Sequence, residues 1–362
     1  MNNYIPFLKL KRNEISALKN LSQKILNELT VFFDFPASKD LTADEFIKKA
    51  DSVYRSIKKN LCGLNFYLDT YDIDSSLIIN GNCCYQYLID KFNGLPIVPV
   101  TGIDREPEHQ MVIIDAVQNH QLSTERIALR ISETDYQSFA TIRQDVNDIL
   151  NCLNLFDEID LILDSRIYQD LSSVDYTSTI CNFIDNFAGY CNDNAIKLGK
   201  IIISGSSIPA SIRDVAEPNS STIVERAELF VYQNVLHQID RSYNLFLGDY
   251  GITSPDYSDL DIPKTAMLKV LAPRIIYSYD NLHYISRGGA IQTHARGFSQ
   301  YNDQANTIIS NDFYRGSDYS WGDDLLYEIG YNSKGTGPGS IIAPALNTHI
   351  TYMFCDYTPE EH

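Results

Sequence analysis

The sequence predicts one large α/β domain, a (β/α)8 TIM-like barrel with a mixed α/β elaboration packed on it at the C-terminal end. Two observations predict this class. Short apolar runs of β type alternate with longer amphipathic segments, and eight such runs precede residue 255. The length of 362 residues is sufficient for one barrel with an additional layer.

The apolar runs are the expected barrel strands. They begin about every 25–45 residues, which is the spacing of strand-plus-helix units. The runs at 161–164 and 200–204 are almost continuously apolar, as in parallel strands that are buried on both faces. An open doubly wound sheet is the main alternative, but it usually has fewer strands. The expected strands are Tyr4–Lys11, Thr30–Phe35, Leu64–Tyr71, Pro96–Thr101, Ile127–Ile131, Asp160–Asp164, Lys200–Ser204 and Asn244–Tyr250.

The segments between the runs predict helices. Thr42 and Glu45 form the pattern of a capping box, in which each side chain accepts from the other residue's backbone amide. Apolar residues then recur at helical spacing from Phe46 to Ile57. The segments Asp175–Tyr190 and Thr222–Ile239 show similar apolar stripes. We therefore expect helices to connect the strands and cover the barrel.

The pattern changes after residue 255. We place the barrel core at residues 1–255 and a hairpin-and-helix elaboration at 256–362, without a linker that would let the second part fold independently. This part is expected to supply the last helix of the barrel. Its expected elements are a hairpin over 275–286 with a turn at Asp280-Asn281, helices at Gln300–Ser310 and Gly322–Ile329, and a closing strand at Asn347–Phe354.

Composition excludes some classes of function. The net charge of −18 disfavours unaided nucleic-acid binding and attachment to an anionic membrane. The seven cysteines include no CxxC pair, and no stretch approaches the ~18 apolar residues of a membrane span. These features predict a cytoplasmic protein. The 24 tyrosines suggest large half-buried surfaces or a binding face.

A site is expected at the carboxyl ends of the strands, where barrel enzymes place their catalytic residues. Carboxylates there suit a hard cation such as Mg²⁺, and the Ser-rich loop after the seventh strand stands where many barrels bind phosphate. The hypothesis is a Mg²⁺-dependent hydrolase or lyase that acts on a phosphorylated small molecule or nucleotide. Its candidate residues are Lys11, Asp164 and Asp249 for catalysis, Lys9, Arg130, Ser204 and Ser206 for ligand binding, and Asp34 and Asp69 for the metal.

The alternative for these residues is structural. Asp and Ser are common where a strand ends because they cap the helix that follows, and charged residues in a barrel mouth form ion-pair networks. The only tryptophan, Trp321, is usually a packing anchor in such a domain. If the C-terminal part covers the barrel mouth, Trp321 and His349 contact a ligand instead.

The chain resembles the beta protein family, named for a bacteriophage protein and found also in bacterial genomes. The resemblance implies a role among the mobile genes through which phages and bacteria compete, and it implies no particular reaction. The residues that carry it are Tyr4–Glu14 with Ala17-Leu18, Gly248–Gly251 leading to Pro273–Tyr277, and Ser320–Asp323 with Asn347–His349. The family-like positions are Lys9, Lys11, Glu14, Asp249, Arg274, Trp321, Asp323 and His349, of which Arg274 joins the candidate ligand-binding set.

Three functions are compatible with these observations. An enzyme or ligand sensor for a small phosphorylated ligand requires a pocket where Lys9, Lys11, Asp164 and Asp249 converge. A non-catalytic protein that binds another protein of a defence or phage complex requires a mouth plugged by side chains and an exposed apolar patch elsewhere. A nuclease subunit would need a basic partner to contact DNA.

Overall fold

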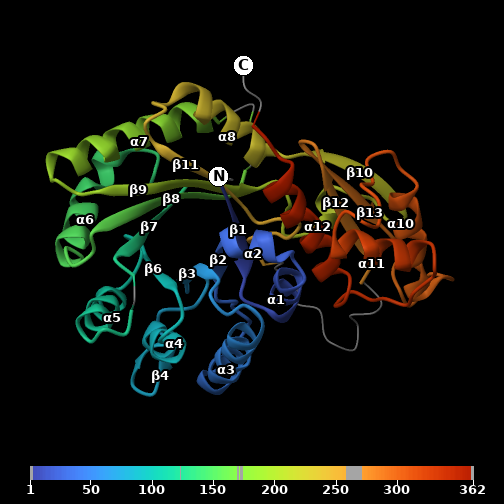
Figure 1. Cartoon of the computed structure of the whole chain (residues 1–362), viewed down its shortest axis with the longest axis horizontal. Helices are drawn as coiled ribbons and strands as arrows, with labels where there is room; N and C mark the ends of the chain where they lie inside the picture. Colours follow the sequence, from blue (N-terminus) through green and yellow to red (C-terminus); the bar gives the residue numbers. More distant parts are fainter. Residues whose placement is uncertain (1–2, 123, 169–170, 172–173, 258–270, 360–362) are drawn as a thin grey trace.

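Eight parallel strands form a closed barrel in the computed structural model, which describes residues 3–122, 124–168, 171, 174–257 and 271–359 (Figure 1). The order around the barrel is β1-β11-β9-β8-β7-β6-β3-β2, so the last strand pairs with the first. The predicted (β/α)8 barrel is therefore confirmed. The strands are β1 (Tyr4–Lys9), β2 (Thr30–Asp34), β3 (Asn65–Asp69), β6 (Ile97–Thr101), β7 (Arg126–Ser132), β8 (Glu158–Ile167), β9 (Leu198–Ser206) and β11 (Asn244–Asp249).

Helices follow the strands and cover the outside of the barrel (Figure 1). The capping box begins α3 as expected, since Thr42 Oγ1 accepts from the Glu45 amide at 3.3 Å and Glu45 Oε2 accepts from the Thr42 amide at 3.4 Å. The helices are α1 (Arg12–Lys19), α2 (Gln23–Glu28), α3 (Ala43–Asn60), α4 (Cys84–Phe92), α5 (Pro107–Gln118), α6 (Phe139–Cys152), α7 (Tyr176–Asp193) and α8 (Ala227–Gln238). A short hairpin of β4 (Ile78–Ile79) and β5 (Asn82–Cys83) precedes α4.

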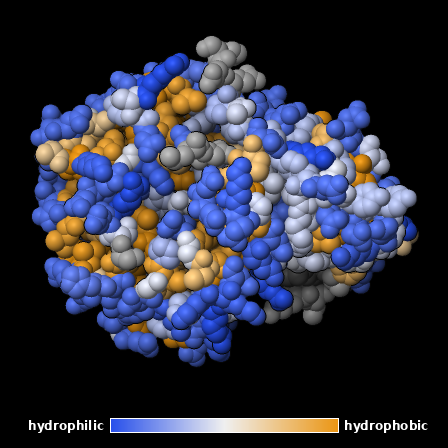
Figure 2. Space-filling model, in the orientation of Figure 1, coloured by the Kyte–Doolittle hydropathy of each residue, from blue (hydrophilic) through white to orange (hydrophobic). Residues whose placement is uncertain are grey.

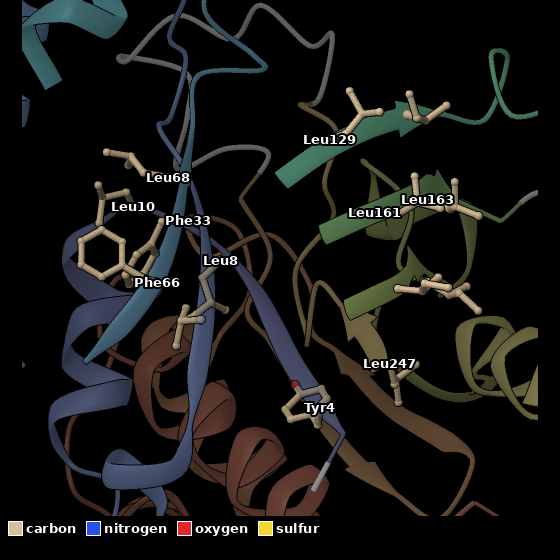
Figure 3. Packing of buried hydrophobic residues seen from close by; sticks show 14 of the residues in the cluster. Tyr4, Leu8, Leu10, Phe33, Phe66, Leu68, Leu129, Leu161, Leu163 and Leu247 are labelled. Carbon is tan, nitrogen blue, oxygen red and sulfur yellow. The ribbon is translucent and has the colours of Figure 1, made fainter. Parts of the chain in front are cut away.

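Alternate residues of each strand point to opposite faces of the barrel wall. Those that point outward, such as Phe33, Phe66 and Leu68, form the apolar layer beneath the helices (Figure 3). Those that point inward fill the barrel with a second apolar cluster, in which the rings of Phe7 and Phe32 stack with centroids 4.2 Å apart. The interior is therefore a packed core, and only the ends of the barrel can hold a site.

The C-terminal part forms a layer beside the barrel (Figure 1). Its sheet has the order β10-β13-β12, and β10 comes from the segment between β9 and α8, so the barrel itself contributes a strand. Helix α12 packs against α1, β1 and β12 and takes the place of the eighth barrel helix. The elements are β10 (Ser220–Glu225), β12 (Arg274–Tyr279), β13 (Leu282–Arg287), α10 (Gln300–Ile309), α11 (Trp321–Gly330) and α12 (Ile342–Cys355), with single 3-10 turns η1 (Ile212–Asp214) and η2 (Gly297–Ser299).

Two sequence-based predictions of secondary structure are wrong. The closing strand expected at Asn347–Phe354 lies within α12, whose residues are buried on almost every side. A helix that is apolar all round has no stripe, so its period cannot be distinguished from that of a buried strand. The helix expected over Thr222–Ile239 begins only at Ala227, because its first residues, rich in β-branched side chains, pair with β13 as part of β10.

No helix of the described residues is long and apolar enough to cross a membrane.

The tight inner packing gives a test of the barrel. A methyl group added at Gly248 would lie 2.6 Å from Phe7 Cε2 and 2.7 Å from Ser204 Cβ. Gly248→Ala should therefore lower the free energy of unfolding by about 1–3 kcal/mol, because the inner layer cannot expand. Urea denaturation measures the change. In the control Gly189→Ala, on α7, the new methyl group meets no atom within 4 Å, so that variant should be neutral or more stable. Equal losses in both variants would contradict the packed interior.

Candidate functional site

The carboxyl end of the barrel carries an inward-facing layer that is almost entirely polar. Six of the residues nominated from the sequence lie in it, and they are buried together with Tyr250. They come from six different strands, which the closed sheet brings to one rim. The six are Lys9, Asp34, Asp69, Arg130, Asp164 and Ser204.

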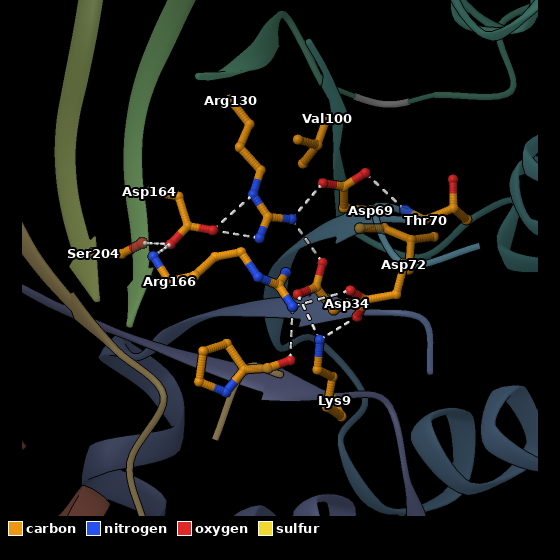
Figure 4. Close-up of polar contacts among 12 residues, drawn as sticks. Lys9, Asp34, Asp69, Thr70, Asp72, Val100, Arg130, Asp164, Arg166 and Ser204 are labelled. Atoms are coloured by element: carbon orange, nitrogen blue, oxygen red, sulfur yellow. Dashed lines mark hydrogen bonds and ion pairs between the residues drawn. The ribbon is translucent and has the colours of Figure 1, made fainter. Parts of the chain in front are cut away.

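Arg130 is the centre of this layer (Figure 4). Its Nη1 donates to Asp34 Oδ1 and Asp69 Oδ2, each at 2.8 Å. Its Nε donates to Asp164 Oδ2 at 3.1 Å, and its Nη2 donates to the same oxygen at 2.5 Å and to the Tyr250 hydroxyl at 3.0 Å. All five N–H groups of the guanidinium are thus occupied.

Further ion pairs extend the cluster toward the loops. Lys9 pairs with Asp34 at 3.2 Å and also with Asp72. Arg166 pairs with Asp72 at 3.3 Å, and Arg105 pairs with Asp69 at 2.9 Å. The cations of Lys9, Arg105, Arg130 and Arg166 balance the anions of Asp34, Asp69, Asp72 and Asp164, and we call these eight residues the rim network.

The rim network holds its carboxylates in the ionised form. Burial alone would raise the pKa of Asp34, but the guanidinium of Arg130 and the ammonium of Lys9 hold it well below its usual range. Burial likewise opposes the ionisation of Asp164, and Arg130 and the Tyr250 hydroxyl lower its pKa. Neither carboxyl is therefore a proton donor near neutral pH.

Asp34 and Asp69 do not fit a magnesium site in this arrangement. Both carboxylates accept from the same nitrogen of Arg130, so its guanidinium supplies the positive charge between them. A hard cation needs several free oxygen ligands. Within the described residues, no group of three or more His, Cys, Asp and Glu side chains could hold a metal ion.

Three members of the rim network, Asp72, Arg105 and Arg166, were missed by the sequence analysis because they lie beyond the predicted ends of the strands. Asp72 and Arg105 lie in the loops after β3 and β6, and Arg166 lies near the end of β8 with a φ of 52°. A positive φ is uncommon for a residue with a side chain. Tyr71 packs against the guanidinium groups of Arg130 and Arg166, whose centres lie 4.2 and 4.9 Å from its ring centroid. No local motif indicates these contacts.

Asp249 does not join the rim network, contrary to the expected convergence with Lys9 and Asp164. It follows Gly248 on β11, and its neighbour Tyr250 points into the barrel, so Asp249 points outward. There it accepts from Tyr4 at 2.8 Å and from Arg226 at 2.6 Å.

His349 contacts Asp249 and not the rim. His349 Nε2 lies 2.9 Å from Asp249 Oδ2, and its Nδ1 lies 2.7 Å from Ser278 Oγ on β12. Arg226 also donates to Glu228 at 2.9 Å, and Ser278 Oγ lies 2.9 Å from His283 Nδ1. These buried residues of the barrel, the C-terminal sheet and α12 form what we call the junction cluster: Tyr4, Arg226, Glu228, Asp249, Ser278, His283 and His349.

The junction cluster is suited to holding the two layers together. Burial opposes the charged form of Asp249, yet His349 and Arg226 hold its pKa below the usual range. Burial lowers the pKa of His283 to about 4, so this imidazole is neutral at physiological pH. The Asp249 carboxylate interacts with Tyr4, Arg226, His349 and the Gly251 amide, so it links β1, β11 and the N-terminal end of α8 to α12.

A second contact explains the motif Ser320–Asp323. Asp323 accepts from Tyr277 at 2.8 Å and from Thr348 at 3.0 Å. Asn347 accepts from the Gly322 amide and donates to the Ala17 carbonyl on α1, both at 2.9 Å. A side chain at Gly322 would collide with Pro344 and Thr348. These residues therefore fix α11 and α12 to each other and to the barrel.

The remaining nominated residues are not members of the rim network. Lys11, the N-cap of α1, lies beside it, since the Nζ atoms of Lys9 and Lys11 lie 5.4 and 5.5 Å from the centroid of the same Tyr257 ring. Ser206 Oγ accepts from the Ile208 amide at 3.0 Å. Arg274 begins β12 in the C-terminal layer. Trp321 begins α11, and no hydrogen bond or ring contact joins it to the rim network within the described residues.

The chain belongs to the Beta protein family, whose family model matches residues 4–354. The resemblance inferred from the sequence is thus confirmed. A search of curated proteins finds no match.

Glu14, one of the family-like positions, gives a test by pH. It is buried in the first turn of α1, and within the described residues its Oε2 has no hydrogen-bond partner. Burial raises its pKa to about 7, although Lys11 and Lys9 oppose the shift. Because the folded pKa exceeds the unfolded one, Glu14 favours folding at low pH, and this contribution is lost as the pH rises from about 4.3 to 7.

We expect Glu14→Gln to remove this dependence. Relative to the wild type, the free energy of unfolding of the variant should rise by about 2–3 kcal/mol between pH 5 and pH 8. Urea denaturation at both pH values measures it, and Glu28→Gln at an exposed position of α2 is the matched control. A constant difference between wild type and Glu14→Gln at the two pH values would refute the assignment.

Proposed function

We propose that the protein is a non-catalytic, partner-binding component that acts in the cytoplasm in the conflict between phages and bacteria. The saturation of Arg130 carries this proposal. Its five N–H groups are bound by Asp34, Asp69, Asp164 and Tyr250, so an anionic substrate finds no free donor on it. The barrel mouth is plugged by its own side chains.

The energetics of the rim network support the same conclusion. A substrate phosphate would have to displace a buried carboxylate from Arg130, and that carboxylate would then be left unpaired. Breaking a buried ion pair in this way costs about 3–5 kcal/mol. The depressed pKa values of Asp34 and Asp164 also deprive the rim of a general acid.

A groove beside the rim supplies a surface for a partner. It has a volume of about 730 Å³ and runs between the β4–β5 hairpin, α4, α5 and the loops after β3 and β6. Two apolar side chains on its lining are exposed, Ile78 at 52% and Met111 at 54%. The space-filling view likewise shows hydrophobic residues exposed among hydrophilic ones over the barrel (Figure 2). We call this feature the α4–α5 groove.

The charges of the α4–α5 groove favour a basic partner segment. Four carboxylates line it, and its arginine, Arg105, already pairs with Asp69 and Asp104. A segment with Arg or Lys residues around an apolar side chain would complement both the charge and the apolar surface. The four carboxylates are Asp104, Glu106, Glu108 and Asp115.

Other observations support the proposed role in phage–bacterium conflict and the proposed cytoplasmic location. The family name associates the chain with phages. All seven cysteines are free, as in proteins of a reducing compartment.

A small phosphorylated ligand at the rim is the second candidate function. Two buried donors favour it, since Arg105 Nε and Arg166 Nη1 have no hydrogen-bond partner within the described residues. Both N–H groups would donate hydrogen bonds to a ligand that enters beside Tyr71.

The two candidates are separated by a peptide-binding experiment. The probe is a fluorescent peptide in which arginines surround a central leucine, and its charge-reversed version with glutamates is the reference. We expect Met111→Lys, and the double variant Glu108→Lys with Asp115→Lys, each to weaken binding of the basic peptide by about tenfold or more in fluorescence anisotropy. Asp145→Lys, at an exposed position of α6 outside the groove, should bind like the wild type.

A plating assay applies the same variants in cells. In bacteria that produce the chain, phage plating efficiency should change with the wild type and with Ser204→Ala, and should not change with Met111→Lys. If Ser204→Ala removes the effect at an unchanged melting temperature while Met111→Lys retains it, the rim is the functional site and the partner-binding proposal fails.

A further inference from the structure

A second cavity lies between the C-terminal sheet and the barrel. It has a volume of about 370 Å³, within the range of small-molecule sites. Its walls come from the loops after β9 and β11, the facing part of the β12–β13 hairpin and the N-terminal end of α12. β9 and β11 are the seventh and eighth strands of the barrel, and the loops after these two strands hold a phosphate in many barrels.

The cavity differs in charge from the rest of the molecule. Among the described residues, its lining includes Arg213, Arg274 and Arg287 and no Asp or Glu. This accumulation of cations occurs in a chain whose net charge is −18. The carboxylate of Glu217 acts on Arg287 electrostatically, but Glu217 is exposed and does not line the cavity.

Arg287 is the buried cation of the cavity. It is only 8% exposed, and its Nη1 donates to the Ala216 carbonyl. Its Nε is buried and has no hydrogen-bond partner within the described residues. A buried N–H of a charged group that lacks an acceptor costs free energy, so a ligand that supplies an acceptor would gain this contribution on binding.

Arg274 lies directly beside Arg287. The two residues are partners in the antiparallel register of β12 and β13, and neither forms an ion pair with a described residue. Like charges at directly opposite positions destabilise a sheet. Arg274 is exposed, so the arginine pair is accessible from solvent.

The other side of the cavity is apolar. Ile212, Ile252 and Ile276 line it together with Ile341 and Ala345 at the start of α12. An ion that interacted only with the arginines would leave this surface without a contact. A ligand that joins an anionic group to an apolar body would use both sides.

We propose that this cavity binds a small organic phosphate with an apolar or aromatic body, and that Arg274 and Arg287 bind the phosphate group. The site is separate from the rim network and from the α4–α5 groove. The proposal of a ligand in this cavity therefore does not depend on the proposed partner-binding function.

The proposal is tested with the full chain by calorimetric titration at constant ionic strength. The probes are phenyl phosphate, phenol and inorganic phosphate. We expect phenyl phosphate to bind more tightly than inorganic phosphate, and phenol to bind least. Arg274→Gln should weaken the binding of phenyl phosphate by about tenfold or more, because it removes a charge-assisted hydrogen bond.

A matched control and a second readout keep the test independent of folding. Arg296→Gln removes an exposed cation that pairs with Asp303, and it should leave the affinity unchanged. Arg274→Gln should also raise the melting temperature without ligand, because it removes the repulsion from Arg287. The proposal is overturned if no phosphate probe binds, if Arg274→Gln binds phenyl phosphate like the wild type, or if inorganic phosphate binds as tightly as phenyl phosphate.

Discussion

The guanidinium of Arg130 is the interaction on which the carboxyl end of the barrel depends. It is 2% exposed and forms ion pairs with three carboxylates that come from three different strands. Without it, Asp34 and Asp69 would still pair with Lys9 and Arg105, but the buried Asp164 would lose its ion pair, and breaking a buried ion pair is strongly destabilising. The closed barrel brings the ends of these three strands to one rim, and this places the three carboxylates within reach of Arg130.

Much of the fold and part of the site follow from the sequence. The count of apolar runs predicts the barrel, and the rule that parallel strands end at one rim brings Lys9, Arg130 and Asp164 together. Asp249 shows the limit of that rule. The rule identifies the end of a strand but not the face, and β11 carries apolar residues at successive positions, so its pattern does not show which side chains point inward. The orientation of Asp249 is set by its neighbours in the barrel and by Arg226, which no local pattern links to it.

The residues that sequence analysis missed depend on loops and on long-range contacts. Asp72 and Arg166 lie outside the regular strand pattern, and the positive φ at Arg166 is a tertiary feature that its amino-acid type does not indicate. Part of helix α12 was predicted as a strand. The helix is buried on nearly every side, so its sequence has no polar face that would indicate the helical period. In each case the conformation depends on the tertiary contacts of the segment. Hydrophobic periodicity indicates only which face of a segment is apolar and which is polar.

The C-terminal layer explains why the family-like positions are spread along the chain. Tyr4, Asp249 and His349 meet in the junction cluster, and Asp323 and Asn347 fix α11 and α12 to the barrel. These positions form the contact between the barrel and the C-terminal layer. Residues from the start, the middle and the end of the chain take part in this contact. The cavity of Arg274 and Arg287 lies between the same two layers. Carboxylates and cations are balanced at the rim, whereas Arg274 and Arg287 form no ion pair with a described residue. Because a buried charged group without a partner is costly, an anion that bound Arg287 would gain free energy there.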